Sequence, residues 1–136
     1  EVIFSPKDKR IFSLIGTINI LNCDSYKVLG GVAEAKCSGV KIIVPYDGYP
    51  IGKVAINSRD IFVSAEKIPG PPINLYEGVI VGSWNNGSVV NVKVRIGGSL
   101  TLTSEIPEEV YKSEGLKVGD KVYVKIKLKT IRTSPY

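Results

Sequence analysis

The sequence predicts an all-β fold of one or two small closed barrels, preceded by a short N-terminal helix. Apolar and polar residues alternate over short stretches such as Val90–Ile96 and Val122–Leu128, which is the period of a half-buried strand. Glycine pairs and one Asn-Gly step separate these stretches, as is typical of tight hairpins. One brief helical pattern precedes the last stretch, and this order fits OB-like barrels.

The first sixteen residues predict the helix. Ser5 suits the N-cap and Pro6 the first helical position. Ile11 and Leu14 lie on one face at helical spacing, and Gly16 supplies the stop. The helical period nearly disappears after this point.

Residues 17–67 predict a first OB-like unit. Its expected elements are a strand at Thr17–Asn22, a hairpin over Tyr26–Lys36, and strands at Val40–Val44, Lys53–Ile56 and Asp60–Ser64, with a loop at Pro45–Gly52. The proline-rich segment Ile68–Pro72 then predicts a stiff linker, because proline fixes the backbone and removes hydrogen-bond donors.

Residues 73–134 predict a second OB-like unit. Its expected elements are strands at Leu75–Trp84, Val90–Ile96, Leu100–Thr103 and Val122–Leu128, with a short helix over Pro107–Glu114. In the last strand, Lys125, Lys127 and Lys129 are expected to form a stripe on one face. Such a stripe is typical of a solvated strand face, and an anion site or a nucleic-acid surface are the alternatives.

Composition excludes several classes of function. The 136 residues contain no histidine and no GxxxxGK[ST] loop, so no catalytic residues and no nucleotide site are expected. No apolar run reaches the roughly 20 residues of a membrane helix. The net charge of +5 favours anionic partners weakly. Cys23 and Cys37 are expected to be reduced thiols, and two thiols make a poor metal site. Because methionine is absent, Glu1 is expected to be an internal start.

Three stretches, taken in order, resemble one family. Phe4–Leu21 resembles the junction that follows the ATPase domain in ABC importer ATP-binding subunits, and Ile56–Ile61 resembles a strand of their C-terminal regions. Gly115–Ile131 resembles the closing turn and strand of the TOBE or MOP regulatory barrel. The resemblance covers almost the whole chain. It favours the molybdate/tungstate branch through the Gly-Leu-x-x-Gly turn at Gly115–Gly119 and through Ile126-Lys127.

The resemblance implies a non-catalytic regulatory and dimerisation region of a cytoplasmic, membrane-associated transport ATPase. Residues 1–16 would be the remnant of the ATPase domain, and ATP and Mg²⁺ would act in that missing domain. Expected partners are a second copy, the membrane subunits of the transporter, and molybdate or tungstate. Nucleic acid is not expected. The alternatives are the regulatory region of a sugar importer, which shares the first two stretches, and a free-standing OB-fold module that binds nucleic acid.

The resemblance also implies site residues. The oxyanion motif usual in the family, Ser-Ala-Arg-Asn, reads Pro71-Pro72-Ile73-Asn74 here and retains only Asn74. The resemblance assigns the charge to Lys127 and places a hydroxyl at Thr130. The backbone N–H groups near Ile73 would supply further donors. For the dimer contact, the expected residues are Ile73, Leu75 and Trp84.

Overall fold

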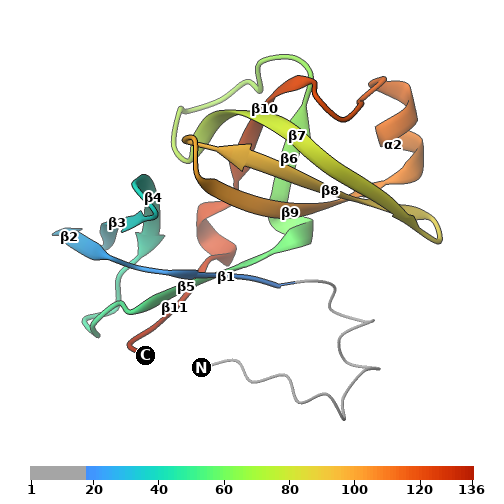
Figure 1. Cartoon of the computed structure of the whole chain (residues 1–136). Helices are drawn as coiled ribbons and strands as arrows, with labels where there is room; N and C mark the ends of the chain where they lie inside the picture. Colours follow the sequence, from blue (N-terminus) through green and yellow to red (C-terminus); the bar gives the residue numbers. More distant parts are fainter. Residues whose placement is uncertain (1–17) are drawn as a thin grey trace, which may run out of the picture.

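The computed structural model describes residues 18–136, and they fold almost entirely into short antiparallel strands (Figure 1). The all-β prediction is therefore confirmed, whereas the helix predicted over residues 1–16 lies outside the described residues. In chain order the elements are β1 (Ile18–Asn22), β2 (Ser25–Leu29), β3 (Val32–Cys37), β4 (Val40–Pro45), β5 (Lys53–Asn57), η2 (Ser58–Asp60), β6 (Ile61–Ser64), β7 (Leu75–Asn86), β8 (Val89–Ile96), β9 (Leu100–Pro107), α2 (Glu108–Ser113), β10 (Lys121–Ile126), η3 (Leu128–Thr130) and β11 (Arg132–Ser134).

The strands form three antiparallel sheets in which the two halves of the chain exchange their last strands. The sheet orders are β1-β5-β11, β2-β3-β4 and β6-β10-β7-β8-β9. Strand β6 of the first half pairs with β10 of the second, and β11 of the second half pairs with β5 of the first. Figure 1 shows β11 running beside β5 toward the C-terminus. The predicted units at residues 17–67 and 73–134 are thus joined by pairing in both directions, and the division between them stays a prediction.

The two halves repeat one pattern of elements. In each half a strand leads into a 3-10 turn and then into the exchanged strand, first as β5, η2 and β6 and later as β10, η3 and β11. Residue Asn19 lies opposite Ile56, and Asn74 accepts a backbone hydrogen bond from the N–H of Ile126 at 3.0 Å. We therefore treat Asn19 and Asn74, and Ile56 and Ile126, as corresponding positions.

One continuous apolar core joins the two halves. On β8, Val90, Val92, Val94 and Ile96 are all buried, as the alternation predicts. The same cluster contains Ile42 and Val54 of the first half. Burial of apolar surface from both halves in one core is the main stabilising contribution to the fold.

The last predicted strand ends earlier than expected. It stops at Ile126, and Leu128–Thr130 forms the 3-10 turn η3. The N–H of Lys127 donates to the Asp60 carbonyl at 3.1 Å, and the N–H of Ile131 donates to the Leu128 carbonyl at 3.2 Å. The predicted strand stripe of Lys125, Lys127 and Lys129 is therefore wrong, because the backbone turns after Ile126 to send β11 toward β5.

The remaining local predictions differ from the structure by a few residues. The helix predicted at Pro107–Glu114 is α2, and the strand predicted from Asp60 begins at Ile61 because Asp60 closes η2. Strand β7 runs on to Asn86 and carries an irregularity between Ile80 and Gly82. The turn of the β7–β8 hairpin therefore lies one step beyond the predicted Asn-Asn-Gly tip.

Candidate functional site

The predicted site lies where β7 begins and β10 ends. Asn74, which precedes β7, has a left-handed backbone with φ of 54° and is 4% exposed. Its Oδ1 accepts from the Ile43 N–H at 2.7 Å, and its Nδ2 donates to the Ile43 carbonyl at 2.8 Å. The Tyr76 hydroxyl lies 3.1 Å from the same Oδ1 and 2.5 Å from the Lys41 carbonyl. The Asn74 side-chain amide therefore hydrogen-bonds to the edge of β4 as a neighbouring strand would, and it links the two halves of the chain.

Asn19 makes the reciprocal contact, which the sequence interpretation missed. Its Oδ1 accepts from the Thr103 N–H at 2.7 Å, and its Nδ2 donates to the Thr103 carbonyl at 2.9 Å. Each half thus uses one asparagine amide to pair with a backbone edge of the other half. The signal for it was the repeated Ile-Asn step at residues 18–19 and 73–74.

Backbone hydrogen bonds place Lys127 and Thr130 close to Asn74. Lys127 is exposed at the start of η3, one residue after Ile126, whose N–H donates to the Asn74 carbonyl. The Thr130 hydroxyl donates to the Lys127 carbonyl at 3.0 Å. The structure therefore brings Asn74, Lys127 and Thr130 together at one junction. The Thr130 hydroxyl proton is used in the hydrogen bond to the Lys127 carbonyl.

The residues expected at a dimer contact do not form one patch of neighbouring side chains. Ile73 is 45% exposed beside Asn74, and Leu75 opens β7 opposite Lys125. Trp84 is also 45% exposed, but it lies at the far end of β7 opposite Asn91, with the Lys93 ammonium 5.6 Å from its ring centre. Ile73 and Leu75 can therefore share a contact surface near the candidate site, and Trp84 belongs to the hairpin tip.

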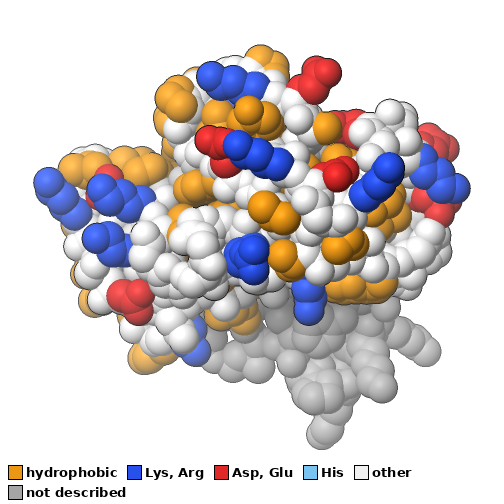
Figure 2. All heavy atoms as spheres, turned by 45° about the horizontal axis from the view of Figure 1, so that its top comes forward, with side chains coloured by type: hydrophobic (Ala, Val, Ile, Leu, Met, Phe, Trp, Pro, Cys, Tyr) orange, Lys and Arg blue, Asp and Glu red, His pale blue; other side chains and the backbone are white. Residues whose placement is uncertain are grey.

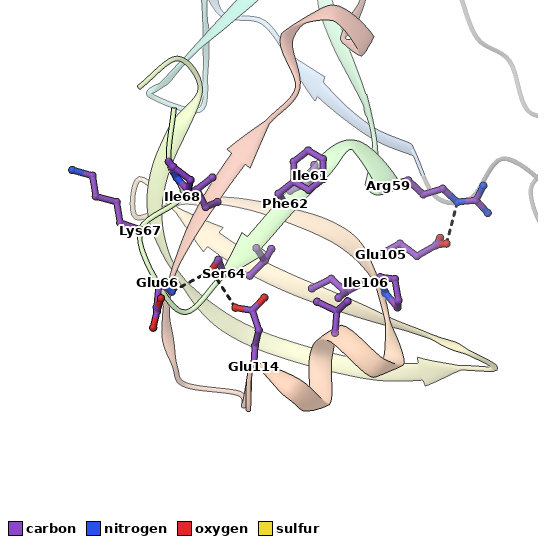
Figure 3. A pocket seen from close by; sticks show the side chains of 14 residues that line it. Arg59, Ile61, Phe62, Ser64, Glu66, Lys67, Ile68, Glu105, Ile106 and Glu114 are labelled. Carbon is purple, nitrogen blue, oxygen red and sulfur yellow. Dashed lines mark hydrogen bonds and ion pairs between the residues drawn. The ribbon is translucent and has the colours of Figure 1, made fainter. Parts of the chain in front are cut away.

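A pocket of about 560 Å³ opens where the five-stranded sheet fails to close (Figure 3). The edge strands β6 and β9 of this sheet are not paired by backbone hydrogen bonds. The Ser104 hydroxyl of β9 links them by donating to the Ile61 carbonyl of β6 at 2.6 Å. Figure 3 shows Glu114 reaching from the end of α2 to Ser64, whose hydroxyl lies 3.1 Å away. The pocket wall is mainly apolar and includes the exposed ring of Phe62.

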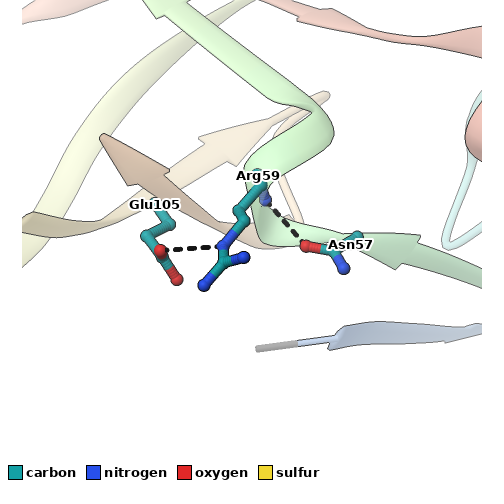
Figure 4. A network of polar contacts seen from close by, with 3 residues as sticks. All are labelled: Asn57, Arg59 and Glu105. Atoms are coloured by element: carbon teal, nitrogen blue, oxygen red, sulfur yellow. Dashed lines mark hydrogen bonds and ion pairs between the residues drawn. The ribbon is translucent and has the colours of Figure 1, made fainter. Parts of the chain in front are cut away.

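An ion pair lies at the other end of this opening (Figure 4). The Arg59 Nε is 3.1 Å from a carboxylate oxygen of Glu105. The backbone N–H of Arg59 donates to the Asn57 Oδ1 at 3.0 Å. These contacts hold η2 against β9.

Burial raises the pKa of two thiols in the first half and of one tyrosine in the second half. Burial raises the pKa of the Cys37 thiol to about 12, and it also raises the pKa of Cys23. The pKa of Tyr76 is raised by burial and, to a smaller extent, by the nearby Cys37. All three groups are thus held in the neutral form at neutral pH. Within residues 18–136, no group of three or more His, Cys, Asp or Glu side chains could hold a metal ion.

Charged side chains are dispersed on the face shown in Figure 2, where acidic groups lie among the lysines and arginines. A sequence-tolerant single-strand binder uses a continuous basic groove with aromatic platforms, and this face has no such groove. None of the helices in residues 18–136 is long and apolar enough to cross a membrane.

Comparison with known proteins identifies the class to which this fold belongs. Residues 72–131 match the TOBE domain family, a non-catalytic domain, and the strands built by these residues include the candidate junction. This match covers less than half of the chain, and the class that the fold itself defines is an OB-like β protein.

The particular relative agrees with the resemblance found in the sequence. The chain is 28% identical over 132 residues to the molybdate/tungstate import ATP-binding protein WtpC of Pyrococcus abyssi. The alignment covers 97% of this chain and 37% of that relative. The predicted resemblance to an ABC importer ATP-binding subunit of the molybdate/tungstate type is confirmed.

A solved structure supports the fold. The chain is similar to the cytoplasmic molybdate-binding protein ModG, in a crystal form with molybdate bound, with a TM-score of 0.63. The match covers 85% of this chain and 93% of that one at 15% identity. At this identity the likeness confirms the OB-like fold.

Proposed function

We propose that the chain is the non-catalytic regulatory region of an ABC importer ATP-binding subunit and that it binds molybdate or tungstate. The observation that carries the proposal is the similarity to the WtpC import protein over 97% of the chain. The parent would be a transport ATPase whose ATP and Mg²⁺ act in an ATPase domain outside this chain. The region would lie in the cytoplasm, attached to the membrane through the transporter subunits.

The junction of β7 and β10 is the proposed oxyanion site. A tetrahedral dianion binds best to several converging donors that include a positive charge. Lys127 would supply an ammonium group and the Ile73 N–H a backbone donor. The Thr130 hydroxyl, which donates to the Lys127 carbonyl in the structure, would have to turn its proton toward the anion. The four bonds of the Asn74 side chain and backbone support a positioning role for this residue, because they fix the loop against β4 and β10.

Binding would regulate transport only through a difference in affinity between two conformations of the transporter. Accumulated oxyanion would bind the regulatory region and stabilise the arrangement that disfavours uptake. A two-fold pair of copies places the same surface on both partners, so Ile73 and Leu75 would lie near the contact and near the anion at once.

Isothermal titration calorimetry tests the binding. Molybdate, tungstate and sulfate are titrated into the chain and into Lys127→Ala, and a single-stranded oligonucleotide serves as the arm for the alternative function. We expect heat with molybdate or tungstate and a weaker response from the variant. No heat with any oxyanion would remove the proposal and leave the sugar-importer type. Salt-dependent binding of the oligonucleotide would favour the nucleic-acid alternative.

Sedimentation velocity tests the self-association. We expect a concentration-dependent dimer that Ile73→Ser weakens, whereas Val118→Ser, at a similarly exposed apolar residue, leaves it unchanged. A monomer at every concentration tested, with and without the oxyanion, would contradict the dimer.

A further inference from the structure

The ammonium group of Lys125 lies against the proline-rich loop at Gly70. A Cβ atom added to Gly70 would stand 2.9 Å from the Lys125 Nζ, and the φ of Gly70 is +112°. A side chain at this position would therefore be strained and would also displace the ammonium. Because Gly70 has no side chain, the Lys125 ammonium can approach the backbone of the loop closely.

Within residues 18–136, no acidic side chain forms an ion pair with Lys125. The described ion pairs involve Lys41, Arg59, Lys112 and Lys121. Lys125 takes part in none of them, and it makes no described hydrogen bond through its side chain. On the neighbouring strands it lies opposite Phe62 and Leu75. Lys125 and Leu75 are partly buried, whereas the Phe62 side chain is 51% exposed. Partial removal of the ammonium from water strengthens its attraction for an anion.

The loop next to Lys125 also presents unpaired donors. Pro69, Pro71 and Pro72 have no N–H group, so Gly70 and Ile73 hold the N–H groups of this stretch. Within residues 18–136, neither N–H has a protein acceptor. Residues 69–73 and Lys125 of β10 together therefore offer an ammonium without a described ion pair and two backbone donors without a described acceptor. Residues 69–73 contain no carboxylate, although Glu66 lies earlier in the same loop. A cation beside backbone donors is the arrangement of an anion site.

We propose that Lys125 and the Gly70 N–H bind the oxyanion directly and that Lys125, rather than Lys127 alone, supplies the charge. This inference rests on the proposed function, because it assigns the contacts of that same site. Lys127 is exposed on η3 and lies at the rim, whereas Lys125 is partly enclosed between β6, β7 and the loop. The ligand class is a tetrahedral oxyanion carrying two negative charges.

Calorimetry with molybdate on the whole chain tests the assignment through Lys125→Gln, Lys125→Arg, Gly70→Ala and the control Lys129→Gln, which removes an exposed lysine from the same segment. Loss of a charge-assisted hydrogen bond corresponds to roughly tenfold to hundredfold weaker binding. We expect that loss for Lys125→Gln, a smaller loss for Lys125→Arg, a clear loss for Gly70→Ala, and no change for Lys129→Gln. Circular dichroism melts of each variant check that the fold is retained.

Three outcomes contradict the inference, and they can be told apart. If the unmodified chain gives no heat with molybdate or tungstate, the proposed function falls and the inference falls with it. If the unmodified chain binds molybdate and Lys125→Gln binds it within about twofold of the unmodified affinity, then the assignment of a charge contact to Lys125 is wrong, whether or not Lys127→Gln weakens binding. A folded Gly70→Ala variant with unchanged affinity would likewise exclude the loop contact.

Discussion

The two junctions of the molecule share one scaffold and differ in their chemistry. At each junction an asparagine amide pairs with a backbone edge of the other half, through Asn19 to Thr103 and through Asn74 to Ile43. The residues around them differ. The second junction has Lys125, Lys127 and Thr130, and the corresponding positions of the first have Ala55, Asn57 and Asp60. Repetition of the scaffold therefore does not repeat the charge at these three positions, and this is why the oxyanion site is proposed at the second junction.

The largest expected effect comes from giving the second junction the residues of the first. The variant Lys125→Ala/Lys127→Asn/Thr130→Asp removes two cations and adds a carboxylate, so we expect loss of measurable oxyanion binding by calorimetry. The fold should remain, because the corresponding residues already occupy the same backbone in the first half. Binding that persists in this variant would place the site elsewhere in the molecule.

The two asparagines provide the second comparison. Truncation to alanine leaves a backbone N–H and a carbonyl without their partner, at about 1–3 kcal/mol for each group. We expect Asn74→Ala to reduce the free energy of unfolding more than Asn19→Ala by roughly 1 kcal/mol, because alanine is strained at the positive φ of Asn74. Urea unfolding measures both, with Asn22→Ala, an exposed position on β1, as the control. Equal losses would show that the backbone conformation of Asn74 contributes nothing.

The open edges of the two halves are joined differently. In the second half Ser104 donates to the Ile61 carbonyl, and the corresponding residue of β4 is the buried Val44. Ser104→Val therefore gives β9 the valine that β4 has at the corresponding position, but it leaves the Ile61 carbonyl without its donor. We expect a loss of about 1–3 kcal/mol in unfolding free energy. The exposed Ser113→Val serves as the control in the same measurement. A stabilised Ser104→Val variant would show that packing outweighs this hydrogen bond.

The thiols distinguish the halves by their response to pH. Cys37 corresponds to Ile96, which does not titrate. Because burial raises the pKa of Cys37 from 9.0 to about 12, the folded chain keeps a proton that the unfolded chain loses. Stability is therefore complete below about pH 9 and falls as the pH rises toward about 12, by up to about 1.4 kcal/mol per pH unit. Urea unfolding at pH 8 and pH 10 measures this slope, and Cys37→Ala should make it shallower. An unchanged slope in that variant would assign the effect to Cys23 or Tyr76, whose pKa values are also raised.

The smallest effect concerns the two 3-10 turns. Ser58 of η2 corresponds to Leu128 of η3, and its hydroxyl is buried without a hydrogen-bond partner among the described residues. A buried hydroxyl without a partner is unfavourable, so Ser58→Ala should raise the free energy of unfolding by about 0.5–1 kcal/mol. Thermal unfolding of this variant, with Ser113→Ala as the control, measures the gain. A lower midpoint would reveal a partner for the hydroxyl.

Local structure could be predicted from the sequence because it depends on neighbours in the chain. The alternation of Val90, Val92, Val94 and Ile96 predicted β8, and the short pattern before Gly115 predicted α2. The Asn-Gly step placed the β7–β8 hairpin within a residue or two, since that dipeptide tolerates the positive φ of Gly87.

Pairing between distant segments could not be predicted in the same way. Alternation identifies which face of a strand is buried but does not name its partner, so the exchange of β6 and β11 was not foreseen. The same limit explains the error after Ile126, where apolar and basic residues continue to alternate through a turn. Lys125 was grouped with its sequence neighbours, although the contact of interest joins it to Gly70 in the linker.

The exchange of the last strands also constrains the order in which the chain can fold. While only the first half of the chain has been synthesised, β5 lacks its neighbour β11, which belongs to the second half. Strand β6 likewise has no β10 to pair with, and a strand with unpaired edges is prone to associate with other chains. Contacts of such long sequence separation slow folding. The two halves are therefore expected to become stable together, once both have been synthesised, and each is expected to lose stability when the other is removed.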